Sequence, residues 1–302
     1  MISVSRQSSA STALLLGFLA FYYRLGVDER IFTESILTEG CRLKSMLHMN
    51  TDTFAFDFGP SFAKTPSAAE AEVIIVCEHA ANWIPPSLDA LGLDDAARDS
   101  HIAWDPGALG VARKLAELLK GPLVEGCISR LVYDLNRPPE SPTAIPPASE
   151  IFDVPGNRDL SDAARAQRVE AVYEPFRAAL AEEIATRESA LRLMVTVHSF
   201  TPVYNGETRA VELGLLHGRD DRFAKAMLAH QPEGLAWDVR LNEPYSASDG
   251  VAHTLDVHGC DNGLLNVMLE IRNDLIATPA QQDAWATALA PWIRATLEDA
   301  AV

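Results

Sequence analysis

The sequence predicts an α/β fold with a mostly parallel or mixed central sheet and helices on both faces. Two observations predict it. Short, apolar, β-branched runs of strand length alternate with amphipathic stretches of helical spacing, and no internal repeat interrupts this alternation. The chain of 302 residues, 48% of them hydrophobic and 22% charged, is also long enough to bury a large core.

The expected elements follow one another from residue 67 to the end of the chain. Strands are expected where runs rich in Val, Ile and Leu suit a buried sheet, at residues 73–77, 128–135, 191–197, 211–216 and 265–271. Helices are expected at residues 109–119, 162–189 and 279–297, the second interrupted near Pro175. Asp105 is a candidate N-cap for the first helix. Residues 138–155 contain six prolines and should form a long ordered loop, a type of segment that is often functional.

Residues 1–66 are expected to be an extension, and residues 67–302 a single catalytic domain. The apolar run at residues 12–23 is too short to cross a bilayer, which takes about 20 residues. We expect a dispensable or poorly ordered extension. An export signal, or a translation start at Met46 or Met49, is the alternative. Residues 54–66, with two prolines, are expected to be a linker.

Composition excludes several classes of function. The formal net charge of −17 comes from 25 basic and 42 acidic residues, and it disfavours nucleic acid as a partner. Neither glycine-rich phosphate-binding motif is present, so nucleotide enzymes are not indicated. Four widely spaced cysteines predict reduced thiols in a cytoplasmic protein. The expected partner is therefore a small molecule, with no stable membrane insertion.

Polar residues stand at the carboxyl ends of four expected strands, where parallel sheets bind their ligands. They are Glu78 and His79, then Arg130, Asp134, Asn136 and Arg137, then His198, and finally Glu270 and Arg272. Two imidazoles and a carboxylate suit Zn²⁺, which lowers the pKa of a bound water to about 7. A nearby carboxylate can move the proton, and arginines can bind a substrate carboxylate or stabilise an oxyanion. The set predicts a metal-assisted hydrolase of a small anionic amide.

Each of these residues also has a purely structural interpretation. A single histidine at a strand end is more often structural than a metal ligand. Glu270 could pair with Arg272, and Arg130, Asp134 and Arg137 could form a buried ion network that fixes the loop. Four further histidines are weaker candidates, of which the last two could line a pocket: His101, His217, His253 and His258.

Five motifs resemble those of the N-formylglutamate amidohydrolase family. They are CEHAANWIP at residues 77–85, HIAWDPGA at 101–108, SRLVYDLNRP at 129–138, VHS at 197–199 and LEIRNDL at 269–275. The similarity runs in order from about residue 70 to residue 298, and residues 1–66 take no part in it. The resemblance implies a fold related to zinc carboxypeptidases and hydrolysis of an N-formyl or N-acyl amino acid.

The resemblance also implies roles for individual residues. His79 and His198 correspond to metal ligands, Asn136 and Arg137 to a pair that holds a substrate carboxylate, and Glu270 to the general base. Arg130 is then expected to stabilise the oxyanion and Arg272 to assist substrate binding. The zinc carboxypeptidase pattern His-x-x-Glu has Asn82 at its fourth position here. The third ligand therefore comes from Asp105 or Glu78. We prefer Asp105, because a helix N-terminus can face the same crevice, whereas Glu78 adjoins His79 and would point away if the strand continued to it.

Three functions are compatible with these residues. The leading one is a zinc-dependent amidohydrolase that converts N-formylglutamate, or a close analogue, to formate and the amino acid. A zinc peptidase or amidase acting on a peptide or cell-wall amide is the second. A non-catalytic protein that binds an acidic metabolite is the third, and it leaves the candidate base beside paired histidines without a purpose.

Overall fold

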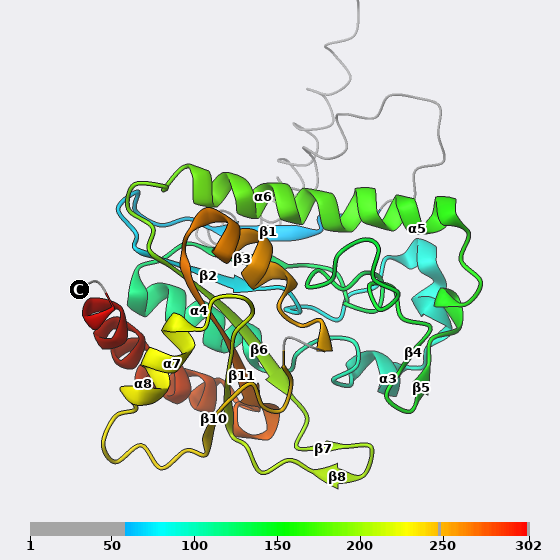
Figure 1. The fold of residues 1–302 in the computed structure, drawn as a ribbon. Helices are drawn as coiled ribbons and strands as arrows, with labels where there is room; N and C mark the ends of the chain where they lie inside the picture. Colours follow the sequence, from blue (N-terminus) through cyan, green and yellow to red (C-terminus); the bar gives the residue numbers. More distant parts are fainter. Residues whose placement is uncertain (1–57, 247–248, 301–302) are drawn as a thin grey trace, which may run out of the picture. The chain divides into compact units, whose positions relative to one another are not determined.

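The structure of this chain is a computed structural model that describes residues 58–246 and 249–300 (Figure 1). The predictions for the apolar run at residues 12–23, the export signal and the alternative translation starts lie outside the described residues. The domain division at residue 67 stays a prediction.

Seven of the described strands form one central sheet, in the order β1-β3-β2-β6-β11-β9-β10. Their bounds are β1 Phe62–Thr65, β2 Val73–Cys77, β3 Leu123–Gly126, β6 Leu193–Phe200, β9 Leu213–Leu216, β10 Val239–Leu241 and β11 Leu265–Arg272. Strands β3, β2, β6 and β11 are parallel to one another, whereas β1 is antiparallel to β3 and β9 is antiparallel to β11. The expected mixed α/β sheet is therefore confirmed.

Helices cover both faces of this sheet (Figure 1). On one face lie α4 (Ala108–Leu119), α7 (Arg222–Ala229) and α8 (Pro279–Asp299); on the other lies the segment of α5 (Asp162–Arg168) and α6 (Glu174–Ala185). Alternate strand residues divide between the two cores: Val195 and Val197 pack toward α4, while Met194 packs toward α6. The strand period therefore sets the side of the sheet that each polar residue occupies.

The expected strand at residues 128–135 is wrong. The strand of this region is β3, and the chain from Ile128 to Leu135 makes consecutive turns, in which the Ser129 carbonyl accepts from the Val132 amide at 2.9 Å. Five of its side chains are nonetheless at most 2% exposed: Ile128, Leu131, Val132, Tyr133 and Leu135. These turns are apolar because they are buried, so hydrophobicity alone could not distinguish them from a strand.

The expected linker at residues 54–66 is also wrong in part, because residues 62–65 form β1 and pair with β3. The expected interruption near Pro175 is confirmed: a π-helical turn, Val169–Tyr173, separates α5 from α6. The proline-rich segment 138–155 is a loop that contains only the two-residue strands β4 (Ala148–Ser149) and β5 (Phe152–Asp153). A short helix, α3 (Asp95–Asp99), and the β7–β8 hairpin (Val203–Tyr204 and Glu207–Thr208) complete the regular elements used below.

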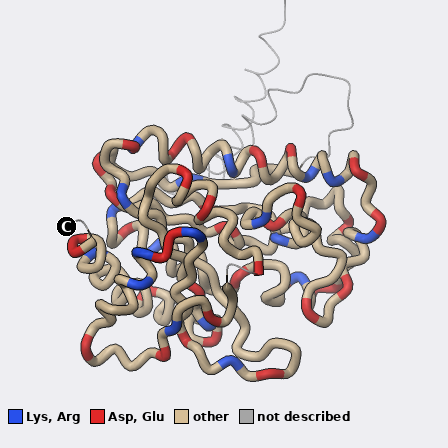
Figure 2. The backbone as a smooth tube through the Cα atoms, viewed as in Figure 1, with Lys and Arg blue, Asp and Glu red and all other residues tan. Residues whose placement is uncertain are grey.

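Charge is spread along the described chain, where Lys and Arg are scattered among more numerous Asp and Glu (Figure 2). Nucleic-acid binding is therefore not indicated. None of the helices within residues 58–246 and 249–300 combines the length and the apolar character that a membrane crossing requires.

Candidate active site

Two histidines and one aspartate meet at the carboxyl end of the parallel strands. His198 lies on β6, His79 follows β2, and Asp105 precedes α4. His198 Nδ1 lies 2.9 Å from Asp105 Oδ2 and 3.1 Å from His79 Nδ1, and His79 Nδ1 lies 3.3 Å from the same Asp105 oxygen. Each of these residues is 2% exposed. Three ligand atoms of a possible metal site thus face one point from three separate segments.

The spacing and chemistry of this triad fit a small divalent cation. Tetrahedral ligands at about 2.0–2.1 Å from Zn²⁺ are about 3.3 Å apart, close to the three distances observed. Two nitrogens and one carboxylate oxygen form the ligand set of many catalytic zinc sites, with a fourth position left for water or substrate. We conclude that His79, Asp105 and His198 could hold such an ion.

A carboxylate stands behind each of the two imidazoles. Asp134 Oδ1 lies 2.7 Å from His79 Nε2, and Glu78 Oε2 lies 3.1 Å from His198 Nε2. Because a carboxylate only accepts, the His79 Nε2 atom carries the hydrogen, which leaves Nδ1 with its lone pair toward the triad. Partners of this kind orient metal-binding histidines and raise their basicity.

The expectation that Glu78 points away is wrong. Continuing the pairing of Val76 with Thr196 places Glu78 beside His198, and its carboxylate contacts the imidazole from the side opposite Asp105. Glu78 is fully buried. Burial opposes its charge, yet His198 and His79 more than offset this and hold the pKa of Glu78 below its usual value. It therefore supports His198 rather than replacing Asp105 in the triad.

Asp105 does not cap helix α4. Gly107 occupies the N-cap position without any side-chain bond, and the Asp105 carboxylate instead accepts from the Ser199 amide at 3.2 Å. Its other oxygen accepts from the Arg130 guanidinium at 3.3 Å. Burial opposes ionisation of Asp105, but the two histidines outweigh it and keep the pKa of the carboxyl well below its usual range. Asp105 is thus an ionised, well-oriented ligand candidate.

Arg130 joins the triad to Asp134. One guanidinium nitrogen donates to Asp105 and the other donates to Asp134 at 2.7 Å. Its side chain keeps 27% exposure, so it is less enclosed than the triad, whose residues are each 2% exposed. The ion network weighed from the sequence is therefore present, and it is continuous with the candidate metal site.

Glu270 lies beside the triad on β11, directly paired with His198 of β6, so the two side chains share one face of the sheet. It is 5% exposed, and its Oε2 atom has no hydrogen-bond partner in the described structure. Burial, reinforced by the negative charge of Asp105 and partly opposed by His198, raises the pKa of Glu270 to about 7. A buried carboxyl that exchanges its proton near neutral pH suits acid–base catalysis.

The three residues expected to bind substrate are largely engaged within the protein. Asn136 donates from its side chain to the Val251 carbonyl and accepts from the Thr254 amide. Arg137 donates to the carbonyls of Asn136 and Gly250 at 3.0 and 2.7 Å. Arg272 donates to Asp274 at 2.8 Å and to the Ala210 carbonyl, which does not favour its assignment to substrate binding. Glu270 and Arg272 do not pair, because Arg272 turns to Asp274.

The weaker histidine candidates lie outside the triad. His253 Nε2 lies 2.8 Å from the Tyr173 hydroxyl, and His101 Nε2 lies 2.8 Å from Glu150 Oε2. His217 contacts the side chain of Asn242, and His258 is buried in the π-helical turn Leu255–Gly259.

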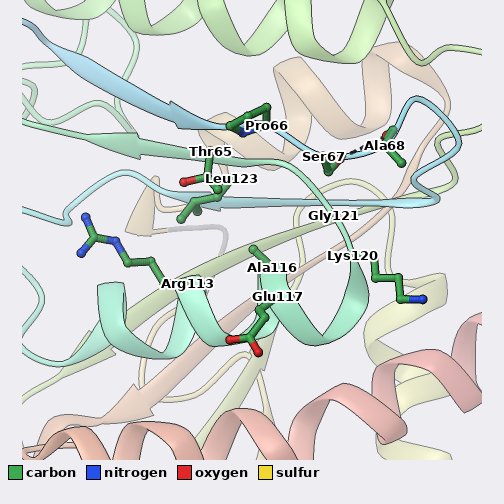
Figure 3. A pocket seen from close by; sticks show the side chains of 10 residues that line it. All are labelled: Thr65, Pro66, Ser67, Ala68, Arg113, Ala116, Glu117, Lys120, Gly121 and Leu123. Carbon is green, nitrogen blue, oxygen red and sulfur yellow. Dashed lines mark hydrogen bonds between the residues drawn. The ribbon is translucent and has the colours of Figure 1, made fainter. Parts of the chain in front are cut away.

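A hollow of about 470 Å³ lies elsewhere on the molecule, between the segment that follows β1 and helix α4 (Figure 3). Its lining includes Arg113, Glu117 and Lys120 of the helix region and Thr65 at the end of β1. It shares no residue with the triad or with Glu270, so it is separate from the candidate active site.

Comparison with known proteins decides the family. The sequence model of the N-formylglutamate amidohydrolase family matches residues 71–277, which is more than half of the chain. The chain belongs to this family. Members of the N-formylglutamate amidohydrolase family hydrolyse amides, and the matched span includes every residue of the triad together with Glu270 and Arg130. The resemblance of the five motifs is therefore confirmed.

Two crystal structures are similar to this chain. A gene product from Agrobacterium tumefaciens is 50% identical, with a TM-score of 0.78, over 81% of this chain and 97% of its own. The N-formylglutamate amidohydrolase of Ralstonia eutropha is 16% identical, with a TM-score of 0.52, over 78% of this chain and 98% of its own, and this likeness shows the fold alone. Among curated proteins, none matches the sequence.

Proposed function

We propose that this chain is a zinc-dependent amidohydrolase that cleaves an N-formyl or N-acyl amino acid, and that N-formylglutamate, giving formate and glutamate, is its substrate. The observation that supports it is the triad of His79, Asp105 and His198 beside a buried Glu270 whose Oε2 has no partner. A pure binding protein has no need of a base in that position. We further propose a cytoplasmic location, on the widely spaced cysteines of the sequence.

The metal would be held by His79 Nδ1, His198 Nδ1 and Asp105 Oδ2. When bound, it would polarise the amide carbonyl and promote ionisation of water. The carboxylates of Asp134 and Glu78 keep the two imidazoles in place from behind. Because six of the residues in and around the triad are at most 5% exposed, their positions are fixed by packing before any ligand arrives: Glu78, His79, Asp105, Asp134, His198 and Glu270.

Glu270 is the proposed proton carrier. Its unpartnered Oε2 would take a proton from the attacking water and deliver it to the nitrogen of the leaving amine. Arg130 is the proposed oxyanion group. Its guanidinium has five N–H donors, and its two hydrogen bonds to Asp105 and Asp134 leave the others for the developing negative charge.

The proline-rich loop supports a small substrate. Its Ala144 carbonyl accepts from the Asp134 amide at 2.8 Å, and the Thr143 hydroxyl accepts from the Arg137 guanidinium at 3.2 Å. Both Ala144 and Ile145 are at most 2% exposed, so this loop is packed against the turn that carries Asp134 and Arg137. A loop fixed in that place restricts the approach of long peptides.

The test is to measure bound metal and amide hydrolysis in the same preparation. We expect about one zinc ion per chain, release of formate and glutamate from N-formylglutamate, and loss of this activity with a chelator. Glu270→Gln should retain the metal and lose most of the turnover. Glu183→Gln is the matched control, since Glu183 is a largely buried glutamate of α6, away from the triad, that pairs with Arg187.

A metal-free active enzyme would refute the assignment of the triad. An active Glu270→Gln enzyme with the same metal content would refute the role of Glu270. Faster hydrolysis of peptides than of N-formyl amino acids would favour the peptidase alternative.

A further inference from the structure

Arg209 precedes β9 and carries a guanidinium with few hydrogen bonds to the described residues. Its guanidinium makes one hydrogen bond, from one terminal nitrogen to the Tyr245 hydroxyl at 2.9 Å. It forms no ion pair with any residue of 58–246 or 249–300, although acidic residues outnumber basic ones in this chain. Four of its five N–H groups therefore have no acceptor among the residues that the structure describes.

Register along the sheet places Arg209 next to the catalytic residues. Phe200 lies two residues beyond His198 on β6, and Arg272 lies two residues beyond Glu270 on β11, with Phe200 and Arg272 paired. The Arg209 guanidinium stands 5.7 Å from the centre of the Phe200 ring, and the Arg209 carbonyl accepts from Arg272. Two residues of a strand span about 6.6 Å. Arg209 therefore contacts the Phe200–Arg272 pair, which lies about that distance beyond the His198–Glu270 pair along the strands.

Three aromatic rings hold the guanidinium there. Besides Phe200, the ring centre of Tyr204 lies 4.4 Å away and that of Tyr245 lies 4.8 Å away. Contacts of this kind attract a cation without neutralising its charge. Arg209 is thus oriented by its neighbours while its charge stays available to a ligand, which lowers the entropic cost of binding.

Tyr245 reaches Arg209 because the segment that follows β10 passes closely over Gly214 of β9. Gly214 is paired with Glu270, and a side chain there would collide with the Glu243 carbonyl. Burial raises the pKa of the Tyr245 phenol to about 12, and the negative charge of nearby Glu270 is the second-largest cause of this rise. Its hydroxyl accepts from Arg209 and keeps its own hydrogen for a second acceptor.

We propose that Arg209, with the Tyr245 hydroxyl, binds the side-chain carboxylate of the substrate and so selects dicarboxylic N-acyl amino acids. This inference rests on the proposed function. The other arginines near the site are less suited to this role: Arg130 is bonded to Asp105 and Asp134, and Arg272 is bonded to Asp274. Arg137 is likewise bonded, to the carbonyls of Asn136 and Gly250. An anionic side chain then meets a planar, charged donor that matches carboxylate geometry.

The experiment compares N-formyl-L-glutamate with N-formyl-L-glutamine, which differ only in the charge of the side-chain end. The wild-type enzyme should prefer the acid in kcat/KM by about 10- to 150-fold, the range for a hydrogen bond to a charged group. Arg209→Gln should abolish this preference by lowering kcat/KM for the acid far more than for the amide, with the content of bound zinc unchanged. Arg209→Lys should retain part of the preference, because it keeps the charge but not the planar fork.

Two further variants complete the test. Arg294→Gln removes an unpaired arginine that donates to the Leu118 carbonyl on the α4–α8 side, and it should keep the wild-type preference. Tyr245→Phe retains the ring beside Arg209 and should lose a smaller part of the preference, which supplies a second result if Arg209→Gln does not fold.

The outcomes separate this inference from the proposed function. Turnover of both substrates with a preference that Arg209→Gln leaves unchanged overturns the role of Arg209 alone. Equal turnover of both substrates by the wild-type enzyme also overturns it alone. A wild-type enzyme that hydrolyses neither substrate overturns the proposed function, and the selection of dicarboxylic substrates with it.

Discussion

Replacing Asp134 with Asn tests whether the carboxylates behind the imidazoles contribute to metal binding. Asp134 contributes no atom to the triad, but its Oδ1 holds His79 Nε2 at 2.7 Å and its Oδ2 accepts from Arg130 at 2.7 Å. Asn keeps the size of the side chain and its acceptor oxygen, and it removes the charge. All three proposed ligands remain in the variant, so a change in affinity reports on the support that Asp134 gives to His79 directly and to Asp105 through Arg130.

The magnitude follows from the hydrogen bond that loses its charge. A hydrogen bond to a charged group contributes about 1.5–3 kcal/mol, roughly twice the value for a neutral pair, so about 0.8–1.5 kcal/mol is lost. This corresponds to roughly a 4- to 13-fold weaker zinc affinity, at the lower end of the losses of about 10- to 100-fold that removal of such partners causes. Loss of charge beside buried Arg130 should also lower the free energy of unfolding.

The assay is competition for Zn²⁺ between the protein and a chromophoric chelator at fixed pH. Glu183→Gln serves again as the control for loss of one largely buried carboxylate. An Asp134→Asn variant that is folded and binds zinc as tightly as the wild-type protein would refute the reasoning, because His79 would then be oriented without its partner.

Three other predictions concern the same chain. Removing the metal with a chelator should lower the Tm and adding Zn²⁺ should restore it, since a ligand at 100 times its Kd stabilises the folded state by about 2.7 kcal/mol. A Tm that does not change with zinc would contradict the metal site. Burial, with the positive charges of His253 and Arg177, lowers the pKa of His258 to about 4, so the folded chain excludes a proton that the unfolded chain binds below pH 6.5. Stability should therefore fall by about 3 kcal/mol between pH 6.5 and pH 4, and urea titrations should show less of this loss in His258→Asn. Gly214→Ala should lower stability by about 1–3 kcal/mol and raise KM, because the added methyl group displaces the segment that carries Tyr245; an unchanged KM would argue against that link.

Sequence reasoning predicted the central strands well and the segments beside them poorly. Strand β2 is wholly apolar, and β6 and β11 are mostly apolar before their carboxyl ends; all three are buried on both faces, a pattern typical of central strands. The turns at residues 128–135 are as apolar as a strand because the α6 side of the core covers them, and the real strand is the shorter β3 just before them. For residues 128–135 the apolar sequence therefore predicts burial correctly but predicts the backbone conformation wrongly.

The site divides in the same way. His79, His198 and Glu270 follow from one rule, that parallel strands gather polar residues at their carboxyl ends. This rule does not predict Arg209, because Arg209 precedes strand β9 rather than following it. Strand β9 runs antiparallel to β11, so the start of β9 lies at the edge of the sheet where β11 ends. The choice between Glu78 and Asp105 depended on how the chain turns after β2, which the spacing of residues does not encode.

The β7–β8 hairpin has a consequence for how substrate preference can change. The proposed metal ligand His198 and the proposed base Glu270 belong to central strands whose neighbours fix them on both sides, whereas Arg209 directly follows a two-stranded hairpin that turns at Asn205 and Gly206. A Cβ added at Gly206 would meet no atom within 4 Å. Lengthening or shortening that hairpin would shift the proposed selecting arginine while the central sheet kept the reaction centre in place, so selectivity and catalysis are carried by two separate sheets.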